Sequence, residues 1–404
     1  MAFYSGVFNT TVNPAELNKR SFSSTLLRLF PDGATPIFAL TSETGRSKAV
    51  SSTHGYFTKT LVFGSVQIDA GAGYAAGITT FTVDSTAGIL PGMILYVAAT
   101  RENIRVLTVA SATSITVTRS FGRVTATGTI ADNTVLPVIG SAFAEGSDRP
   151  TARGLTTVYV GNFTQIFRNA WALTDTARAS ATEMGFTNIA ESRRDCGLLH
   201  AVDIESAIVF GQAKMDTAGA QPLHATQGII DATEQYAAAN TTTLGSTTNY
   251  TQLIAAMEPA WTYSHDLGET KKRMCFAGAT AMKVFNDIAR KNGTVQIMQG
   301  QTSFGMQYTT FMFYKGTVIM MEHPLLNGIN GMAGMAIGVD MPAMKLAYMD
   351  GRDTKSEEYG GSGRNNANGV DADGGSLTTE FATEFLNPYG NFILYGATAG
   401  IADT

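Results

Sequence analysis

The chain has 404 residues, enough for one large hydrophobic core or two to three smaller ones. Only 15% of the residues are charged, against roughly 25% in an average globular protein. The net charge of −5 excludes a strongly basic surface of the kind that binds nucleic acid phosphates. Two cysteines are too few for a disulfide framework, and no apolar run approaches the roughly 18 residues of a membrane span. Low charge with much Gly and Thr is typical of a chain covered by neighbouring copies.

Residues 1–50 contain a few apolar side chains, three prolines and no sustained hydrophobic period. So little apolar area cannot offset an ordering entropy of about 1–2 kcal/mol per residue. We therefore expect an arm that becomes ordered only on a partner surface.

The next part predicts a long hairpin that carries an inserted domain. Residues 56–66 alternate in the manner of a strand leading out, and residues 156–173 have the composition of the strand coming back. Between them, β-branched or alternating runs occupy residues 80–83, 94–97, 104–109 and 115–118, separated by turn formers. Strands of this length, spaced by about ten residues, predict a small barrel or sandwich.

Residues 188–214 form the clearest helix. Asn188 and Glu191 have capping-box spacing, and a broad apolar stripe follows them. At about 1.5 Å per residue the helix would run roughly 40 Å, long enough to act as a spine. The stripe comprises Ile189, Cys196, Leu198, Leu199, Val202, Ile204, Ile208 and Val209.

The rest of the chain alternates between helices and strands, which indicates an α+β fold. We expect helices at residues 250–265 and 280–291, and a polar loop at residues 360–375. The predicted strands are residues 273–277, 295–298, 308–314, 317–321, 335–339, 344–348, 377–386 and 392–395.

The nearest approach to a chemical site is His200 with Asp203 and Glu205 on the spine helix. A His-x-x-Asp pair supplies at most two metal ligands, so capped or subunit-facing charges are favoured. Cys196 and Cys275 sit in apolar stripes without a cation that would lower the thiol pKa, which favours inert buried thiols.

Other polar patterns are weaker still. Asp371, Asp373, Gly374 and Glu380 fit positions of a calcium loop, but Gly369 stands where the first carboxylate is needed. Residues 360–364 lack the Lys-Ser/Thr of a phosphate loop, and residues 271–273 suggest a solvated basic face. Methionines at 320, 321 and 332–344 favour adaptable core or subunit packing. The sequence therefore predicts no catalytic, cofactor-binding or metal-binding residue set.

The order of these parts resembles a known family. The resembling segments are residues 106–109 and 115–119 of the insert, 161–167, 203–208 of the spine helix, 304–305, 345–348, 351–355 and 380–387. Together they resemble the major capsid proteins of tailed bacteriophages with the Hong Kong 97-type fold, in the subgroup with a β-domain inserted in the extended loop.

The resemblance implies an N-terminal arm (1–50), an extended loop (51–69 and 141–160) and an inserted β-domain (70–140). It also implies a peripheral domain (161–218 and 341–404) with the spine helix, and an axial domain (219–340). Copies would form the hexamers and pentamers of an icosahedral shell around packaged double-stranded DNA, without specific DNA binding. Implied partners are a portal, a separate scaffolding protein and a possible decoration protein, with assembly in the host cytoplasm and no membrane association.

Two other classes stay open at this point: a tail or adhesin component, which would usually be β throughout, and an enzyme, which lacks a residue set. We further expect no maturation cleavage, because no long charged helical segment precedes the hairpin. We also expect no covalent cross-link between Lys59 and Asn387, because no motif ties these two residues together.

Overall fold

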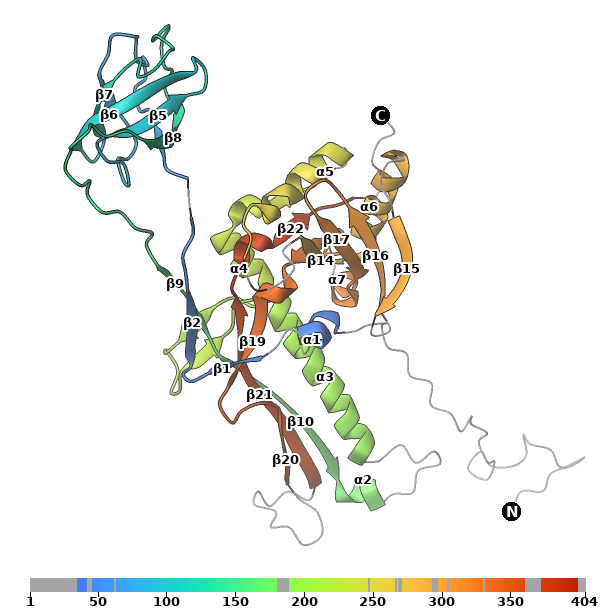
Figure 1. Ribbon diagram of the computed structural model, residues 1–404. Helices are drawn as coiled ribbons and strands as arrows, with labels where there is room; N and C mark the ends of the chain where they lie inside the picture. The colour runs from blue at the N-terminus through green and yellow to red at the C-terminus, as the bar shows by residue number, and fades with distance from the viewer. Residues whose placement is uncertain are drawn as a thin grey trace, which may run out of the picture. The chain divides into compact units, whose positions relative to one another are not determined.

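The computed structural model describes residues 35–41, 46–61, 63–179, 189–245, 248–265, 267, 271–292, 297–303, 306–329, 331–359 and 372–398. The chain divides into two compact units (Figure 1). Unit 1 comprises Met1–Tyr56 and Val160–Thr404, and unit 2 comprises Phe57–Tyr159. The chain leaves unit 1 along β2 (Thr53–Thr58) and returns along β9 (Val158–Phe163), and these two strands pair. The predicted α+β class is confirmed.

Unit 2 is a small barrel. Its strands run in the order β3-β8-β5-β6-β7-β4. The bounds are β3 (Ser65–Gln67), β4 (Thr80–Thr82), β5 (Met93–Val97), β6 (Glu102–Ser111), β7 (Ser114–Thr118) and β8 (Val135–Ser141). The two end strands meet just beyond their ends, where Asp69 N donates to Thr82 O at 3.0 Å and Asp84 N to Gln67 O at 3.1 Å. These bonds close the sheet and leave no long edge open.

The four runs expected at residues 80–118 are the strands β4 to β7 of this barrel. Their alternation is the cause, because every second side chain points into the barrel. Phe81, Leu95, Ile104 and Ile115 are fully buried there, each worth about 1.5–3 kcal/mol of burial.

In unit 1, a five-stranded sheet lies along the spine helix α3 (Ile189–Phe210), which Figure 1 shows beside β10 and β21. The order is β1-β19-β21-β10, with β20 also paired to β21. The bounds are β1 (Arg46–Ala49), β10 (Gln165–Thr174), β19 (Met344–Met349), β20 (Lys355–Tyr359) and β21 (Ala372–Phe385); the short helix α2 (Asp175–Ala179) follows β10.

The buried face of α3 is narrower than predicted. It carries Cys196, His200, Ile204 and Ile208 at four-residue spacing, whereas Leu199, expected in the stripe, is 62% exposed. The helix also ends earlier than expected, at Phe210. A Cβ on the next residue, Gly211, would lie 2.5 Å from the carbonyl oxygens of Ala207 and Thr226, so the chain turns there at a position that needs glycine. Strands β11 (Lys214–Asp216) and β12 (Leu223–Ala225) then form a hairpin.

A seven-stranded mixed sheet forms the other half of unit 1, in the order β13-β22-β18-β14-β17-β16-β15. Its strands are β13 (Thr241–Thr243), β14 (Lys272–Ala277), β15 (Ile297–Ser303), β16 (Met306–Met312), β17 (Thr317–Glu322), β18 (Ala336–Val339) and β22 (Phe392–Tyr395). Its helices are α4 (Ile229–Tyr236), α5 (Tyr250–Met257), α6 (Ala279–Asn292) and α7 (Pro324–Gly328). Residues 392–395, grouped with the peripheral domain from sequence, belong to this sheet.

Helix α5 is shorter than the predicted 250–265. It begins with a capping box, in which Asn249 and Gln252 each accept from the other's backbone N–H. It ends at Met257 and tightens into the 3-10 helix Glu258–Trp261. Pro259 lacks the N–H that a further α-helical turn would require, which explains the stop.

Part of the predicted arm is built into unit 1. Helix α1 (Pro36–Thr41) places Ile37, which is fully buried, in the same core as Ile204 and Ile208. Strand β1 pairs in parallel with β19. The expectation that all of residues 1–50 depend on a partner surface is therefore wrong for residues 36–41 and 46–49, and residues 1–34 lie outside the described residues.

Candidate functional site

The three polar residues singled out on the spine helix do not converge. His200 Nδ1 lies 2.6 Å from Asn169 Oδ1 and Nε2 lies 2.8 Å from Thr379 Oγ1. Asp203 accepts from the same Asn169 amide at 2.7 Å. Burial lowers the pKa of His200, with Asp203 opposing the shift, so the imidazole stays neutral at pH 7. The ring ties α3 to strands β10 and β21.

Glu205 faces a different part of unit 1, where it accepts from Ile37 N, Phe38 N and His323 Nε2. Within the described ranges, no group of three or more His, Cys, Asp or Glu side chains is arranged to hold a metal ion.

Both cysteines are buried, as the sequence predicts. Burial raises the pKa of Cys196, and it raises the pKa of Cys275 to about 12. The thiolate is the reactive form of cysteine, so neither side chain is suited to act as a nucleophile near neutral pH.

The calcium-loop pattern is broken by a strand. Asp373, Gly374 and Glu380 all lie in β21, while Gly369 and Asp371 lie outside the described residues. Seven residues of strand separate Asp373 from Glu380 by roughly 23 Å and point them to opposite faces. Glu380 instead accepts from Thr164 Oγ1 at 2.9 Å and pairs with Arg352 Nε at 2.5 Å. These residues cannot wrap around one ion.

The basic run at the start of β14, expected to be a solvated face, is not solvated throughout. Lys271 and Lys272 are exposed, but Arg273 is fully buried. Its guanidinium donates to the carbonyl oxygens of Gly390 (2.7 Å), Ala260 (3.0 Å) and Lys272 (3.0 Å). β14 is a central strand of the seven-stranded sheet, and that position buries the side chain.

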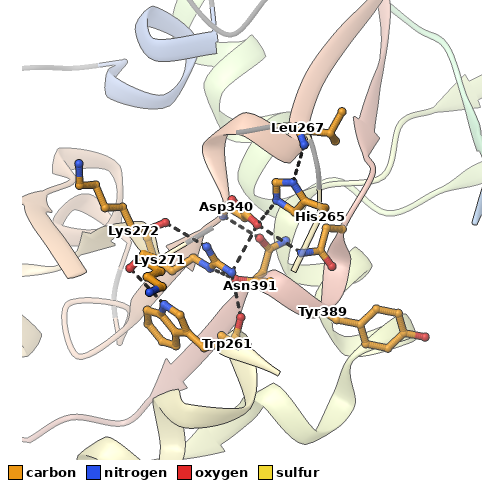
Figure 2. Close-up of polar contacts among 12 residues, drawn as sticks. Trp261, His265, Leu267, Lys271, Lys272, Asp340, Tyr389 and Asn391 are labelled. Carbon is orange, nitrogen blue, oxygen red and sulfur yellow. Dashed lines mark hydrogen bonds and ion pairs between the residues drawn. The ribbon is translucent and has the colours of Figure 1, made fainter. Parts of the chain in front are cut away.

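Arg273 shares its site with Asp340, and their Nη2 and Oδ2 atoms lie 3.4 Å apart. Figure 2 shows His265 and Asn391 pointing toward Asp340. His265 Nε2 lies 2.7 Å from Asp340 Oδ2, and Asp340 N donates to Asn391 Oδ1 at 3.0 Å. His265 Nδ1 in turn accepts from Leu267 N, so both ring nitrogens are engaged. These contacts all reach Oδ2 of Asp340, whereas Oδ1 of the same carboxylate is buried without a hydrogen-bond partner among the described residues. The cluster joins β14 to the segments that follow β18 and precede β22.

Unit 2 carries the most distinctive surface, a groove of about 870 Å³. Its lining includes large apolar side chains, of which Phe63 is 87% exposed and Leu61 is 66% exposed. The lining further includes Leu90, Met93, Val138, Ile139, Phe143, Arg153 and Leu155. We call this surface the unit 2 groove. The sequence assigned the lining residues partly to the extended loop (51–69 and 141–160) and partly to the inserted β-domain (70–140). It did not identify the groove, which arises where these separate segments meet.

The unit 2 groove has several exposed apolar side chains in its lining. Leu61, Phe63, Ile139, Phe143 and Leu155 are each about half exposed or more. Only part of each side chain faces the groove, so the apolar area that a partner could cover there is a fraction of their exposed surface. Exposed apolar side chains that gather on one surface mark interaction sites.

No helix among the described residues is long and apolar enough to cross a membrane. The apolar side chains of unit 2 belong to strands and to the segments that join them.

Comparison with known proteins gives the family. The sequence matches the SU10 major capsid protein family over residues 5–398. It is 50% identical over 407 residues to the major capsid protein of Pseudomonas phage PaMx41, covering 98% of this chain and 96% of that relative. The capsid structure of the cyanophage P-SCSP1u aligns over 95% of this chain and 94% of its own, at 10% identity and a TM-score of 0.49. A structure from Mycobacterium phage Adephagia covers 97% of this chain and 98% of its own, at 11% identity and a TM-score of 0.45. The family match and the 50% identical relative show that this chain belongs to the SU10 major capsid protein family.

Proposed function

We propose that this chain is the subunit of a tailed-bacteriophage head, in which copies assemble as hexamers and pentamers into an icosahedral shell around packaged double-stranded DNA. Family membership supports the assembly role. The structural observation that carries the proposal is the unit 2 groove, because its apolar side chains stay in water unless another surface covers them.

The proposed function implies that a second copy of the chain covers the unit 2 groove. Apolar burial contributes roughly 25 cal/mol/Å², so covering the unit 2 groove alone would stabilise a contact by only about a few kcal/mol. Association costs about 4–15 kcal/mol in lost freedom, so a single contact of this size is marginal. Heterologous contacts that close into rings give each subunit several such interfaces, and the closed assembly is then stable.

The charge of the chain suits an enclosing role. A net charge of −5 disfavours tight binding to phosphates, so the shell would hold DNA by enclosure. The long α3 and the two large sheets of unit 1 are consistent with the Hong Kong 97-type architecture implied by the sequence. Within this proposal the partners are a portal, a separate scaffolding protein and a possible decoration protein, assembled in the host cytoplasm into the virion.

Covalent cross-linking is not needed in this account. Asn387, the conceivable acceptor for Lys59, is buried, and its amide donates to Asp340 Oδ2 at 3.3 Å. A lysine would have to displace that contact before reacting. We propose that buried apolar area supplies the stability, so that particles boiled in detergent run as one band near the 42.8 kDa monomer.

The test compares Phe63→Ser with the exposed control Thr127→Ala by sedimentation velocity of the purified full-length proteins. Phe63 is largely solvent-exposed, so its replacement should leave the subunit folded while removing apolar contact. We expect shell-sized particles from the wild type and from Thr127→Ala, and mainly small species from Phe63→Ser. Equal assembly of the two variants would exclude the unit 2 groove as an interface between copies.

A further inference from the structure

A buried carboxylate in unit 1 holds the N-terminal helix in place. Glu205 is fully buried, and its two oxygens receive three hydrogen bonds. Oε1 accepts from Ile37 N at 2.9 Å and from His323 Nε2 at 2.8 Å, and Oε2 accepts from Phe38 N at 2.7 Å. Two donors thus come from the first turn of α1, and one from the junction between β17 and α7.

The geometry assigns the proton positions. His323 Nδ1 accepts from Leu325 N at 3.2 Å, so Nε2 carries the hydrogen that is donated to Glu205. The first helical residue, Pro36, has no N–H, and the N–H groups of Ile37 and Phe38 lie in the first turn, where the carbonyl four residues earlier falls outside α1. The carboxylate satisfies both of them at the end of the helix where negative charge is favoured.

Apolar packing acts at the same place. Ile37 is fully buried in the core that contains Ile204 and Ile208 of α3, and Phe38 and Leu40 pack against that core. If α1 moved away, Glu205 would lose two of its three donors, and a carboxylate with too few hydrogen bonds beside an apolar core is costly. Partly docked positions of α1 are therefore disfavoured, and docking is close to all-or-none.

We propose that Glu205 is a positioning residue: with His323 it docks α1 on the spine helix, and the docked helix is needed for assembly with neighbouring copies. The docking rests on the contacts above. The role toward a neighbour rests, in addition, on the proposed function.

Glu205→Gln in the full-length protein tests the docking. Glutamine keeps the shape of glutamate, but its NH₂ group replaces one of the two acceptors, so at least one of Ile37 N, Phe38 N and His323 Nε2 loses its acceptor on residue 205. Limited digestion with chymotrypsin, read by mass spectrometry, reports cleavage after Phe38 and Leu40. We expect this cleavage to become about tenfold faster or more, because hydrogen bonds to charged groups are the stronger ones.

Asp203→Asn is the matched control, since it removes a carboxylate from the same helix that bonds Asn169 and not α1. It should leave cleavage in α1 unchanged. His323→Phe removes one donor to Glu205 and keeps an aromatic ring, so we expect cleavage in α1 to rise by an intermediate amount. If Glu205→Gln fails to fold, His323→Phe still tests whether the Glu205 site docks α1. Unchanged cleavage in both Glu205→Gln and His323→Phe, or cleavage that rises equally throughout unit 1, would overturn the docking role.

Shell formation by Glu205→Gln separates the two parts of the inference. Faster cleavage in α1 with fewer closed shells supports the role toward a neighbour, and faster cleavage with normal shells refutes it. If the wild type itself forms no shells, the proposed function fails, while the cleavage result still decides whether Glu205 docks α1.

Discussion

Arg273 and Asp340 form a fully buried ion pair, in which Nη2 lies 3.4 Å from Oδ2 and neither side chain reaches solvent. The pair connects β14 with the end of β18, and its neighbours Asn387 and Asn391 bring in the segment before β22. A buried pair of this kind contributes little over apolar packing, but losing one partner is expensive. The cluster thus fixes how the strands of the seven-stranded sheet meet.

Asp340→Asn tests this reasoning. The substitution removes the buried carboxylate charge that faces the guanidinium of Arg273, which should lower the free energy of unfolding by about 3–5 kcal/mol. Arg193→Met is the control, because the Arg193–Glu358 pair is exposed and should contribute about 0–1 kcal/mol. Denaturant unfolding of both variants provides the comparison. Equal losses would show that burial does not govern the contribution of these pairs.

The pH dependence of unit 2 should follow Glu102. This buried carboxylate accepts from Arg119 Nε at 2.8 Å, from Arg119 Nη2 at 2.7 Å and from Ser120 N at 2.8 Å. Burial alone would raise its pKa, but these hydrogen bonds outweigh burial and hold the pKa below its ordinary value. A lowered pKa gives stability that is present above the unfolded value of about 4.3 and is lost as the pH falls through the folded value.

We therefore expect wild-type thermal stability to fall more steeply below about pH 4.3 than that of Glu102→Gln. Near pH 7 the variant should be the less stable of the two, because Arg119 stays buried without its anion. Thermal unfolding followed by circular dichroism across this range measures both effects. Parallel pH profiles for the two proteins would rule out Glu102 as the titrating group.

Close packing between β18 and β22 gives a third prediction. Gly338 lies opposite Phe392, and a Cβ at position 338 would overlap the fully buried Phe392 ring. Gly338→Ala should therefore cost about 1–3 kcal/mol or more through overpacking. Gly245→Ala is the control, because among the described residues no heavy atom outside its chain neighbours lies within 4 Å of its Cβ position. The test compares the denaturant midpoints of unfolding of the two variants. A Gly338→Ala protein as stable as Gly245→Ala would show that the Phe392 ring does not pack closely against position 338.

The sequence predicted elements whose pattern is local. The alternating β-branched runs of unit 2 predicted β4 to β7, and the helical spacing of apolar residues predicted α3. Both predictions worked because an element that buries one face repeats its apolar residues at a regular interval. It did not predict α1 or β1, since both are short and depend on distant partners, Glu205 and β19. It also placed Arg273 in solvent. A short basic run in the sequence does not reveal whether it lies on a surface or inside a sheet. Asp340, the partner of Arg273, lies far along the chain, so local sequence gives no sign of the pair.

The placement of α1 and β1 changes the expected effect of shortening the chain. A chain lacking residues 1–50 loses Ile37 from the core, worth about 1.5–3 kcal/mol, and leaves Glu205 with one donor. It should unfold at a clearly lower temperature than a chain lacking residues 1–34, which keeps both elements. Thermal unfolding of the two truncated proteins measures the difference. Identical midpoints would mean that α1 and β1 add nothing to the fold of the subunit.

Electron microscopy of the purified full-length protein tests the central claim most directly. If copies of this chain form a head shell through apolar contacts such as the unit 2 groove, the images should show closed, hollow particles of uniform size built from hexamers and pentamers. Tubes, fibres or only small particles, under conditions where the subunit is folded, would contradict the proposed function.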